Sequence, residues 1–233
     1  MRLAFLLGLL AASSAHAQML PYDGAWTDSA SGEAVVSLPV GYADEPEREW
    51  PLLVFLHGAG ERGDSLARVN VHGPVAERQA GRDLPFVIVA PQVPADGRWT
   101  VGRVVATMDA ALDAYQIDPD RVYLTGLSMG GYGTWEAIER IPDRIAAAVP
   151  ICGGGNPIGL AAAREVPVWA FHGAMDPVVP ISASVAMVGR LRSAGGNVRF
   201  AVYPDAGHDA WTETYANPAV YEWLLSHSLA DRR

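Results

Sequence analysis

The amino-acid sequence predicts an α/β fold in which helices cover both faces of a mostly parallel β-sheet. Between residues 33 and 227, short β-rich runs alternate with longer segments that suit helices, and most connections between them are short. The chain has 233 residues, 50% of them hydrophobic and 18% charged, so it can bury the core of one large domain. No internal repeat, low-complexity tract or domain boundary is visible. We therefore expect a single domain over residues 18–233.

The strands of the predicted sheet are short apolar runs, several of them bounded by Pro or Gly. They are residues 34–38, 52–56, 86–90, 122–125, 147–151, 168–171 and 198–202. The predicted helices are residues 101–115, closed by the turn at 118–120, and residues 132–140, 182–194 and 218–229. Two longer connections, residues 58–85 and 91–100, follow C-terminal strand ends, where open α/β sheets hold their ligands.

The first seventeen residues have the pattern of a secretory signal peptide. A basic residue, Arg2, precedes an apolar run over residues 3–12, and Ala15-His16-Ala17 resembles a cleavage site with small residues. The run is shorter than the roughly 20 residues that a membrane span needs. We expect residues 1–17 to be removed, and the mature chain to be soluble and secreted or periplasmic.

Composition excludes several classes of function. The formal net charge is −9, which disfavours nucleic acid and other polyanions as partners. All seventeen basic residues are Arg, so a Schiff-base lysine, a P-loop lysine and a Ser-Lys dyad are impossible. The one cysteine, Cys152, permits no internal disulfide and no Cys-rich zinc site, and we expect it to be a small buried apolar residue.

The segment around Ser128 is typical of a nucleophile on a sharp turn. The apolar run 122–125 leads into Gly126-Leu-Ser128-Met-Gly130, and a helix-compatible segment follows. Glycines at both flanking positions let such a turn form, and the turn lifts the serine Oγ above the sheet. Because ordinary Gly-rich turns also match this motif, the serine needs a base and an orienting acid elsewhere in the chain.

The chain supplies an acid and a base in the required order. Asp176 follows the predicted strand 168–171, and His208 follows the strand 198–202. Both come just after C-terminal strand ends, on the edge expected for Ser128. The order Ser, Asp, His is the one that this type of sheet requires. The sequence therefore predicts a Ser128–His208–Asp176 triad.

Other histidines and acids could compete for these roles. His172 ends a strand and precedes the acid, so we expect it to be a buried hydrogen-bonding residue rather than the base. Asp205 and Asp209 flank His208 on its own loop and are expected to be solvated. His72 and His227 are expected to be exposed.

An oxyanion hole needs two backbone N–H donors, each of which lowers the barrier by roughly 3 kcal/mol. Met129, directly after the nucleophile, is the first expected donor. The second is expected from the loop after residues 52–56, with Ala59 as first choice and Gly60 as second.

The same loop also matches a dinucleotide-binding fingerprint, Gly58-x-Gly60-x-x-Gly63. In such a site the acid that binds the ribose ends the next strand, whereas here Asp83 precedes that strand. We therefore expect no nicotinamide or flavin cofactor.

These stretches resemble α/β-hydrolases of the serine esterase type, close to secreted polyhydroxybutyrate-depolymerase-like and phospholipase/carboxylesterase-like hydrolases. The resemblance rests on residues 55–63, 126–135, 171–180 and 204–208. It implies the Ser128, Asp176, His208 triad and neither a metal nor a cofactor. Dienelactone hydrolases share the sheet but use a cysteine nucleophile. Prolyl oligopeptidases, which are also similar, carry a propeller for which this chain has no room. Only residues 152–166 lie where many lipases insert a lid, so an open cleft is expected.

The predicted function is hydrolysis of short-chain acyl, polysaccharide-linked or small polyester esters through an acyl-enzyme. A serine peptidase or amidase remains an alternative, and a non-catalytic binding module is a remote one. Trp99 and Trp211 are candidates for lining the cleft, whereas Trp135 is expected in the core. Glu61 and Arg62 are candidates for polar substrate contacts, with a surface ion pair as the alternative. The oligomeric state is left open.

Overall fold

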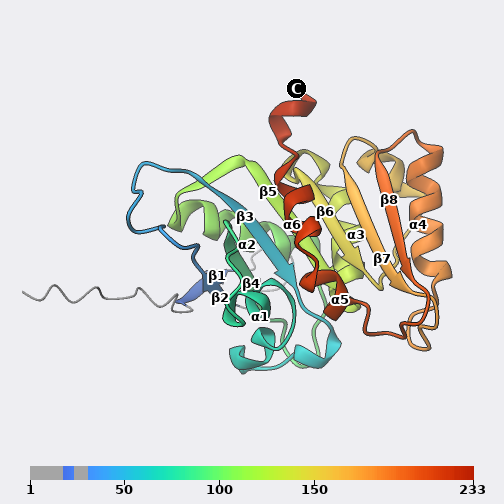
Figure 1. Cartoon of the computed structure of the whole chain (residues 1–233), viewed down its shortest axis with the longest axis horizontal. Helices are drawn as coiled ribbons and strands as arrows, with labels where there is room; N and C mark the ends of the chain where they lie inside the picture. Colours follow the sequence, from blue (N-terminus) through green and yellow to red (C-terminus); the bar gives the residue numbers. More distant parts are fainter. Residues whose placement is uncertain (1–17, 24–30) are drawn as a thin grey trace, which may run out of the picture.

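A computed structural model describes residues 18–23 and 31–233, so the predicted signal peptide at residues 1–17 lies outside the described residues. An eight-stranded sheet forms the centre of the molecule, in the order β1-β2-β4-β3-β5-β6-β7-β8 (Figure 1). β1 pairs with β2, and β2 with β4, in antiparallel fashion. Every pairing from β4 to β8 is parallel. The mostly parallel sheet predicted from the sequence is confirmed.

All seven predicted strands are present; the one at residues 147–151 has the predicted bounds, and the others differ from theirs by a few residues at one or both ends. The strands are β1 (Gln18–Asp23), β2 (Ser31–Ser37), β3 (Trp50–Leu56), β4 (Val87–Pro91), β5 (Ile117–Leu127), β6 (Ala147–Ile151), β7 (Val168–Gly173) and β8 (Val198–Tyr203). The first of them, β1, was not predicted. The turn expected at residues 118–120 is wrong, because these residues already belong to β5, whose first residue pairs with Trp50 of β3.

Helices cover both faces of the sheet. They are α1 (Gly73–Gln79), α2 (Val101–Ala114), α3 (Met129–Arg140), α4 (Ser182–Ser193), α5 (Trp211–Ala216) and α6 (Pro218–Leu225). The four predicted helices correspond to α2, α3, α4 and α6, whereas the short helices α1 and α5 were missed. The predicted fourth helix ends too late, because α6 stops at Leu225.

Alternate residues of the strands point to opposite faces and so build two cores. On one face, Leu52, Val54 and Leu56 of β3 pack with α2, α3 and α4. On the other face, Leu53 and Phe55 pack with α1, α5 and α6. Figure 1 shows α5 and α6 together on that second face. The central strands β3, β4 and β6 are apolar and buried along their whole length, as expected for parallel strands covered on both sides.

The fold brings three loops to one edge of the sheet. Because β5, β7 and β8 run parallel, their C-terminal ends lie at the same edge. Ser128 directly follows β5, Asp176 comes shortly after β7, and His208 comes shortly after β8. Within residues 18–23 and 31–233, none of the helices combines the length and the apolar character that a membrane crossing requires.

Candidate active site

Ser128 occupies a strained backbone conformation between β5 and α3. Its φ of 51° and ψ of −114° lie outside the regions that non-glycine residues prefer, which costs on the order of 1–3 kcal/mol. The backbone around it is held on both sides, since the Ser128 N–H donates to Ile151 O at 2.9 Å and the Tyr132 N–H donates to Ser128 O at 3.0 Å. This turn places the serine side chain above the sheet edge.

The two glycines of the motif are required by close backbone contacts. A Cβ atom on Gly126 would lie 2.4 Å from the Gly130 carbonyl oxygen, and one on Gly130 would lie 1.9 Å from the Leu56 carbonyl oxygen. Both distances are far below van der Waals contact. The Gly-x-Ser-x-Gly pattern therefore lets the turn, helix α3 and the end of β3 pack together.

Ser128, His208 and Asp176 form a continuous chain of hydrogen bonds. His208 Nε2 lies 2.9 Å from Ser128 Oγ, and His208 Nδ1 lies 2.7 Å from Asp176 Oδ2. The side chain of Asp176 is fully buried, whereas that of His208 is 19% exposed. The structure thus brings together the three side chains that the sequence placed at one edge, in the geometry of a nucleophile, a base and an orienting acid.

The Asp176 carboxylate is fixed by its own loop. Its Oδ1 accepts hydrogen bonds from the Val178 and Val179 N–H groups at 2.8 and 2.9 Å. Burial alone would raise the pKa of Asp176, but the hydrogen bonds from His208, Val179 and Val178 outweigh it and hold this pKa below its ordinary value. Asp176 is therefore ionised and can stabilise a positive charge on His208.

Two further buried groups surround this carboxylate. His172 is wholly buried, as predicted, with Nε2 at 3.3 Å from Asp176 Oδ2. The Cys152 thiol is also buried and donates to His208 O at 3.2 Å. Burial raises the pKa of Cys152 to about 11, so the thiol is neutral. Cys152, His172 and Asp176 could each offer one atom to a metal ion. Because these atoms already form hydrogen bonds, a hydrogen-bonded network is the better description.

The predicted oxyanion loop is organised by a histidine whose role the sequence did not reveal. His57 is fully buried; its Nδ1 donates to Gly58 O at 2.6 Å and its Nε2 accepts from the Val93 N–H at 3.0 Å. Burial lowers the pKa of His57 to about 4, which keeps it neutral. The C=O and N–H of a planar trans peptide point in opposite directions. Anchoring the Gly58 carbonyl toward His57 therefore turns the Ala59 N–H away from it.

Met129 and Ala59 are both suited to donate to an oxyanion. Each is the first residue of a helix, α3 or the short 3₁₀ helix Ala59–Glu61, where a backbone N–H has no acceptor within the helix. Gly60, the alternative donor, is exposed beside Ala59. Both residues lie at the start of the same short helix, so the choice of Ala59 over Gly60 stays a prediction.

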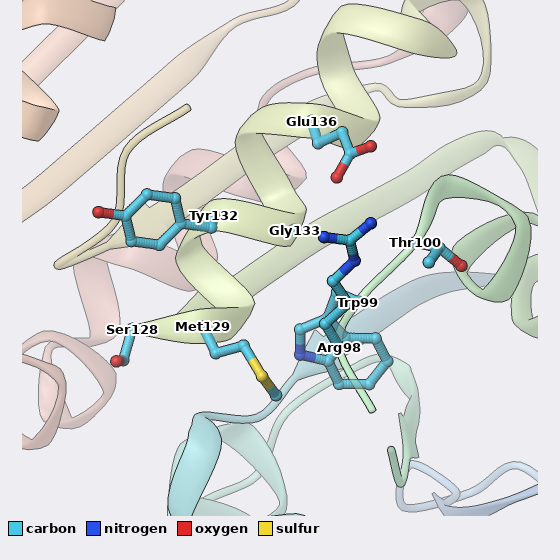
Figure 2. A pocket seen from close by; sticks show the side chains of 8 residues that line it. All are labelled: Arg98, Trp99, Thr100, Ser128, Met129, Tyr132, Gly133 and Glu136. Atoms are coloured by element: carbon cyan, nitrogen blue, oxygen red, sulfur yellow. The ribbon is translucent and has the colours of Figure 1, made fainter. Parts of the chain in front are cut away.

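A cavity of about 540 Å³ opens beside Ser128 (Figure 2). One wall is a face of α3, where Met129, Tyr132, Gly133 and Glu136 follow the spacing i, i+3, i+4, i+7. The opposite wall is the loop from Arg98 to Thr100. In Figure 2 the Arg98 guanidinium points toward the Glu136 carboxylate. Within the described part of the chain, neither of these two charged groups has an ion-pair or hydrogen-bond partner.

The aromatic candidates differ in their positions. Trp99 lines the cavity but is only 3% exposed, and its indole N–H donates to His57 O at 2.9 Å. Trp211 meets His208 edge to face, with ring centroids 5.1 Å apart. Trp135 lies in the core, as predicted.

The polar candidates beside the oxyanion loop have mainly protein partners. Arg62 donates to Ala59 O at 3.0 Å and to Gly97 O at 3.3 Å, so it ties this loop to the loop before α2. Glu61 lies 3.9 Å from His72 Nε2, and no ion pair joins it to Arg62 among the described residues. The expectation that His72 is an exposed histidine is wrong: its side chain is 31% exposed and its ring packs against Trp211.

Five of the residues that line the cavity were not predicted from the sequence, namely Arg98, Thr100, Gly133, Tyr132 and Glu136. The spacing of the last two from Met129 along one helix face was visible in the sequence. Their convergence with Arg98 was not, because it depends on how the loop before α2 packs against α3.

Comparisons with known proteins agree with this fold. A family model described as "Dienelactone hydrolase family" matches residues 94–222, which is more than half of the chain. The chain is 35% identical over 141 residues to a bifunctional acetylxylan esterase/xylanase of Neocallimastix patriciarum, covering 55% of this chain and 20% of that protein. It is 30% identical over 180 residues to a monoacylglycerol lipase of Mycolicibacterium smegmatis, covering 75% of this chain and 59% of that protein.

A solved structure described as a thermostable esterase is 33% identical to this chain, with a TM-score of 0.77. The match covers 90% of this chain and 63% of that one. The chain thus spans less than two thirds of the length of these relatives. The fold is that of the α/β-hydrolases predicted from the sequence. We expected dienelactone hydrolases to carry a cysteine as the nucleophile, whereas this chain carries a serine at position 128. The family model nevertheless matches the loops that hold Ser128, Asp176 and His208. The chain belongs to the dienelactone hydrolase family.

Proposed function

We propose that the chain is a serine esterase that hydrolyses carboxylic esters through an acyl-enzyme. The observation that carries this proposal is the continuous chain of hydrogen bonds from Ser128 through His208 to Asp176. His208 removes the Ser128 proton as Oγ attacks the ester carbonyl. Asp176 holds the imidazole in the correct tautomer and stabilises the imidazolium. The Met129 and Ala59 N–H groups stabilise the oxyanion.

After the attack on the ester carbonyl, His208 acts as a general acid. His208 gives its proton to the leaving alcohol, and the acyl group stays on Ser128 Oγ. Water then enters, loses a proton to His208 and attacks the acyl carbonyl. As the bond between the acyl group and Ser128 Oγ breaks, His208 returns this proton to Oγ, which releases the acid and restores the serine. The reaction therefore follows a ping-pong scheme and needs no lysine.

The cavity supports sugar-linked esters as the substrates. Arg98 only donates hydrogen bonds and Glu136 only accepts them. A substrate group that lies between the two side chains must therefore accept a hydrogen bond from Arg98 and donate one to Glu136. Neighbouring hydroxyls of a sugar ring can do both, and they carry no net charge. The Tyr132 side chain, which is 41% exposed on the same wall, offers an apolar face to the C–H groups of such a ring. The relative from Neocallimastix patriciarum is described as an acetylxylan esterase/xylanase, which agrees with this choice.

The signal peptide predicted for residues 1–17 adds a cellular setting to this proposal. Export would bring the enzyme to polysaccharide esters outside the cytoplasm. The connection from β6 to β7, residues 152–167, has no inserted lid domain, which suits a polymer-linked substrate.

Steady-state kinetics with three substrates test the proposal. We expect hydrolysis of p-nitrophenyl acetate and of an acetylated xylo-oligosaccharide, little turnover of the matching anilide, and no turnover by Ser128→Ala. The double variant Arg98→Gln/Glu136→Gln should lose about tenfold in kcat/KM on the sugar ester and little on p-nitrophenyl acetate. Arg140→Gln, at the end of α3 outside the cavity, is the matched control. Faster cleavage of the anilide would favour an amidase, and full turnover by Ser128→Ala would contradict the triad.

A further inference from the structure

Arg62 lies between two loops that border the candidate active site, and the proposed mechanism gives it no role. Its Nε donates to Ala59 O at 3.0 Å, and its Nη1 donates to Gly97 O at 3.3 Å. Ala59 belongs to the oxyanion loop after β3, whereas Gly97 directly precedes Arg98, which lines the cavity. A guanidinium group only donates and a carbonyl oxygen only accepts, so the direction of both hydrogen bonds is fixed.

The two carbonyl groups next to the oxyanion donors are both held by side chains. Gly58 O accepts from His57 Nδ1, and Ala59 O accepts from Arg62 Nε. In a planar trans peptide, the N–H of the next residue points away from the C=O. His57 therefore orients the Ala59 N–H, and Arg62 orients the Gly60 N–H. Whichever of these two groups donates, a carbonyl oxygen turned toward the oxyanion would repel it, so both carbonyls need a partner elsewhere.

Gly60 gives the oxyanion loop little restraint of its own. It is exposed, and a Cβ atom added to it would meet no atom within 4 Å. Because glycine has the widest choice of backbone conformations, the peptide between Ala59 and Gly60 can turn over unless a side chain holds it. The hydrogen bond from Arg62 to Ala59 O supplies this restraint.

The neighbouring parts of the two loops are joined without Arg62. The buried Gln92 side chain donates to Glu61 O at 2.8 Å, directly before Arg62. The Gly63 N–H, directly after Arg62, donates to Val93 O at 3.0 Å. Replacing the Arg62 side chain should therefore leave both loops in place and free only the peptide that it holds.

We infer that Arg62 is a positioning residue that keeps the Ala59 carbonyl turned away from the reacting ester and so aligns the N–H groups of the oxyanion hole. It acts through the backbone of Ala59 and Gly60, which differs from the direct substrate contact expected from the sequence. Its second contact, at Gly97, braces the oxyanion loop against the loop that carries Arg98. This inference rests on the proposed serine esterase function.

Steady-state kinetics of Arg62→Ala with p-nitrophenyl acetate test this role. Removing a whole oxyanion donor costs about 10²–10³-fold in kcat, so a donor that is only partly misaligned should cost roughly tenfold. KM should stay nearly constant, because Arg62 does not touch the substrate. Active sites are counted by titration with a fluorophosphonate, so that unfolded protein does not enter kcat. Arg140→Ala, at the exposed end of α3, is the matched control.

Chemical rescue separates positioning from a general loss of structure. Arg62 is partly exposed, so a free guanidinium ion can enter the space left in Arg62→Ala and donate to Ala59 O. Guanidinium chloride, kept below denaturing concentrations, should raise the kcat of Arg62→Ala several-fold and leave wild type and Arg140→Ala unchanged. The double variant Arg62→Ala/Gly60→Ala should also recover part of the lost kcat, because a methyl group at position 60 restricts rotation of the backbone.

Three results would overturn the inference. The first is an unchanged kcat in Arg62→Ala. The second is a raised KM with an unchanged kcat, which would identify Arg62 as a substrate contact. The third is a fall in kcat that neither guanidinium nor Gly60→Ala reverses, which would indicate a general loss of structure.

Two further arms keep the test decisive. If Arg62→Ala does not fold, Arg62→Gln, which keeps most of the side-chain length, is measured in its place with and without Gly60→Ala, and the same fall and partial recovery are expected. If wild type neither hydrolyses the ester nor reacts with the fluorophosphonate, the proposed function fails and the inference fails with it. An active wild type with an unaffected Arg62→Ala would refute the inference alone.

Discussion

His57→Gln should remove part of the acid sensitivity of the fold. Burial lowers the pKa of His57 from 6.5 to about 4 in the folded protein. Between these two values the unfolded chain binds a proton that the folded protein does not, so stability falls as the pH decreases. The contribution of His57 to the free energy of unfolding is complete above its pKa in the unfolded chain, 6.5. It is lost progressively as the pH falls from 6.5 to about 4, the pKa in the folded protein, and does not change below that.

The size of this loss follows from the shift. A difference of about 2.5 pKa units at 1.36 kcal/mol per unit gives about 3 kcal/mol. A glutamine amide does not titrate, and its carbonyl oxygen can take the place of Nε2 as the acceptor for the Val93 N–H. Between about pH 7 and pH 4, the free energy of unfolding of the variant should therefore fall by about 3 kcal/mol less than that of wild type. This difference does not depend on how stable the variant is at neutral pH.

Urea unfolding at several pH values measures this difference. The free energy of unfolding of wild type and His57→Gln is plotted against pH, and the wild-type curve should fall by about 3 kcal/mol more than the variant curve between about pH 7 and pH 4. All other titrating groups are common to both proteins and cancel in the comparison. Parallel curves would refute the reasoning, because they would mean that His57 does not remain neutral in the folded state.

Three further outcomes are expected. Gly130→Ala should destabilise the fold by several kcal/mol, because the added Cβ would lie 1.9 Å from the Leu56 carbonyl oxygen. Gly60→Ala has open space around the added Cβ and should melt close to the wild-type temperature. Calorimetry compares the melting temperatures of the two variants. Asp176→Asn should lower kcat by roughly 10⁴-fold with little change in KM, because His208 would lose its counter-charge and its correct tautomer. A fall in kcat smaller than tenfold would exclude Asp176 as the orienting acid. Cys152 should not react with a thiol reagent at about pH 8 until the protein unfolds, because its pKa is raised to about 11, and rapid labelling of the native protein would contradict its burial.

The sequence predicted most of the sheet because parallel strands buried on both faces appear as uninterrupted apolar runs. β6 (Ala147–Ile151) was located to the residue for this reason. β1 (Gln18–Asp23) was missed because this antiparallel edge strand is not an uninterrupted apolar run. The short helix α1 (Gly73–Gln79) was hidden in a polar, Arg-containing loop, where only its packing against α5 shows which face is buried.

The triad residues were predictable because their chemistry and chain order are constrained together. Ser128, Asp176 and His208 each follow a strand of one parallel set, so their positions in the chain imply one common edge. His172 was predicted as a buried hydrogen-bonding residue, which the structure confirms. The role of His57 was not predictable in the same way. It depends on a hydrogen bond from the Val93 N–H, a group distant in sequence that only the folded backbone brings within reach.

Covalent labelling tests whether Ser128 is the nucleophile. Folded protein is treated with a fluorophosphonate, digested, and mapped by mass spectrometry, with Ser128→Ala and heat-unfolded protein as controls. We expect one phosphonyl group per chain on Ser128, formed only in the folded protein and greatly slowed by His208→Ala. Modification of a different residue, or an unlabelled Ser128 in protein that still hydrolyses esters, would contradict it.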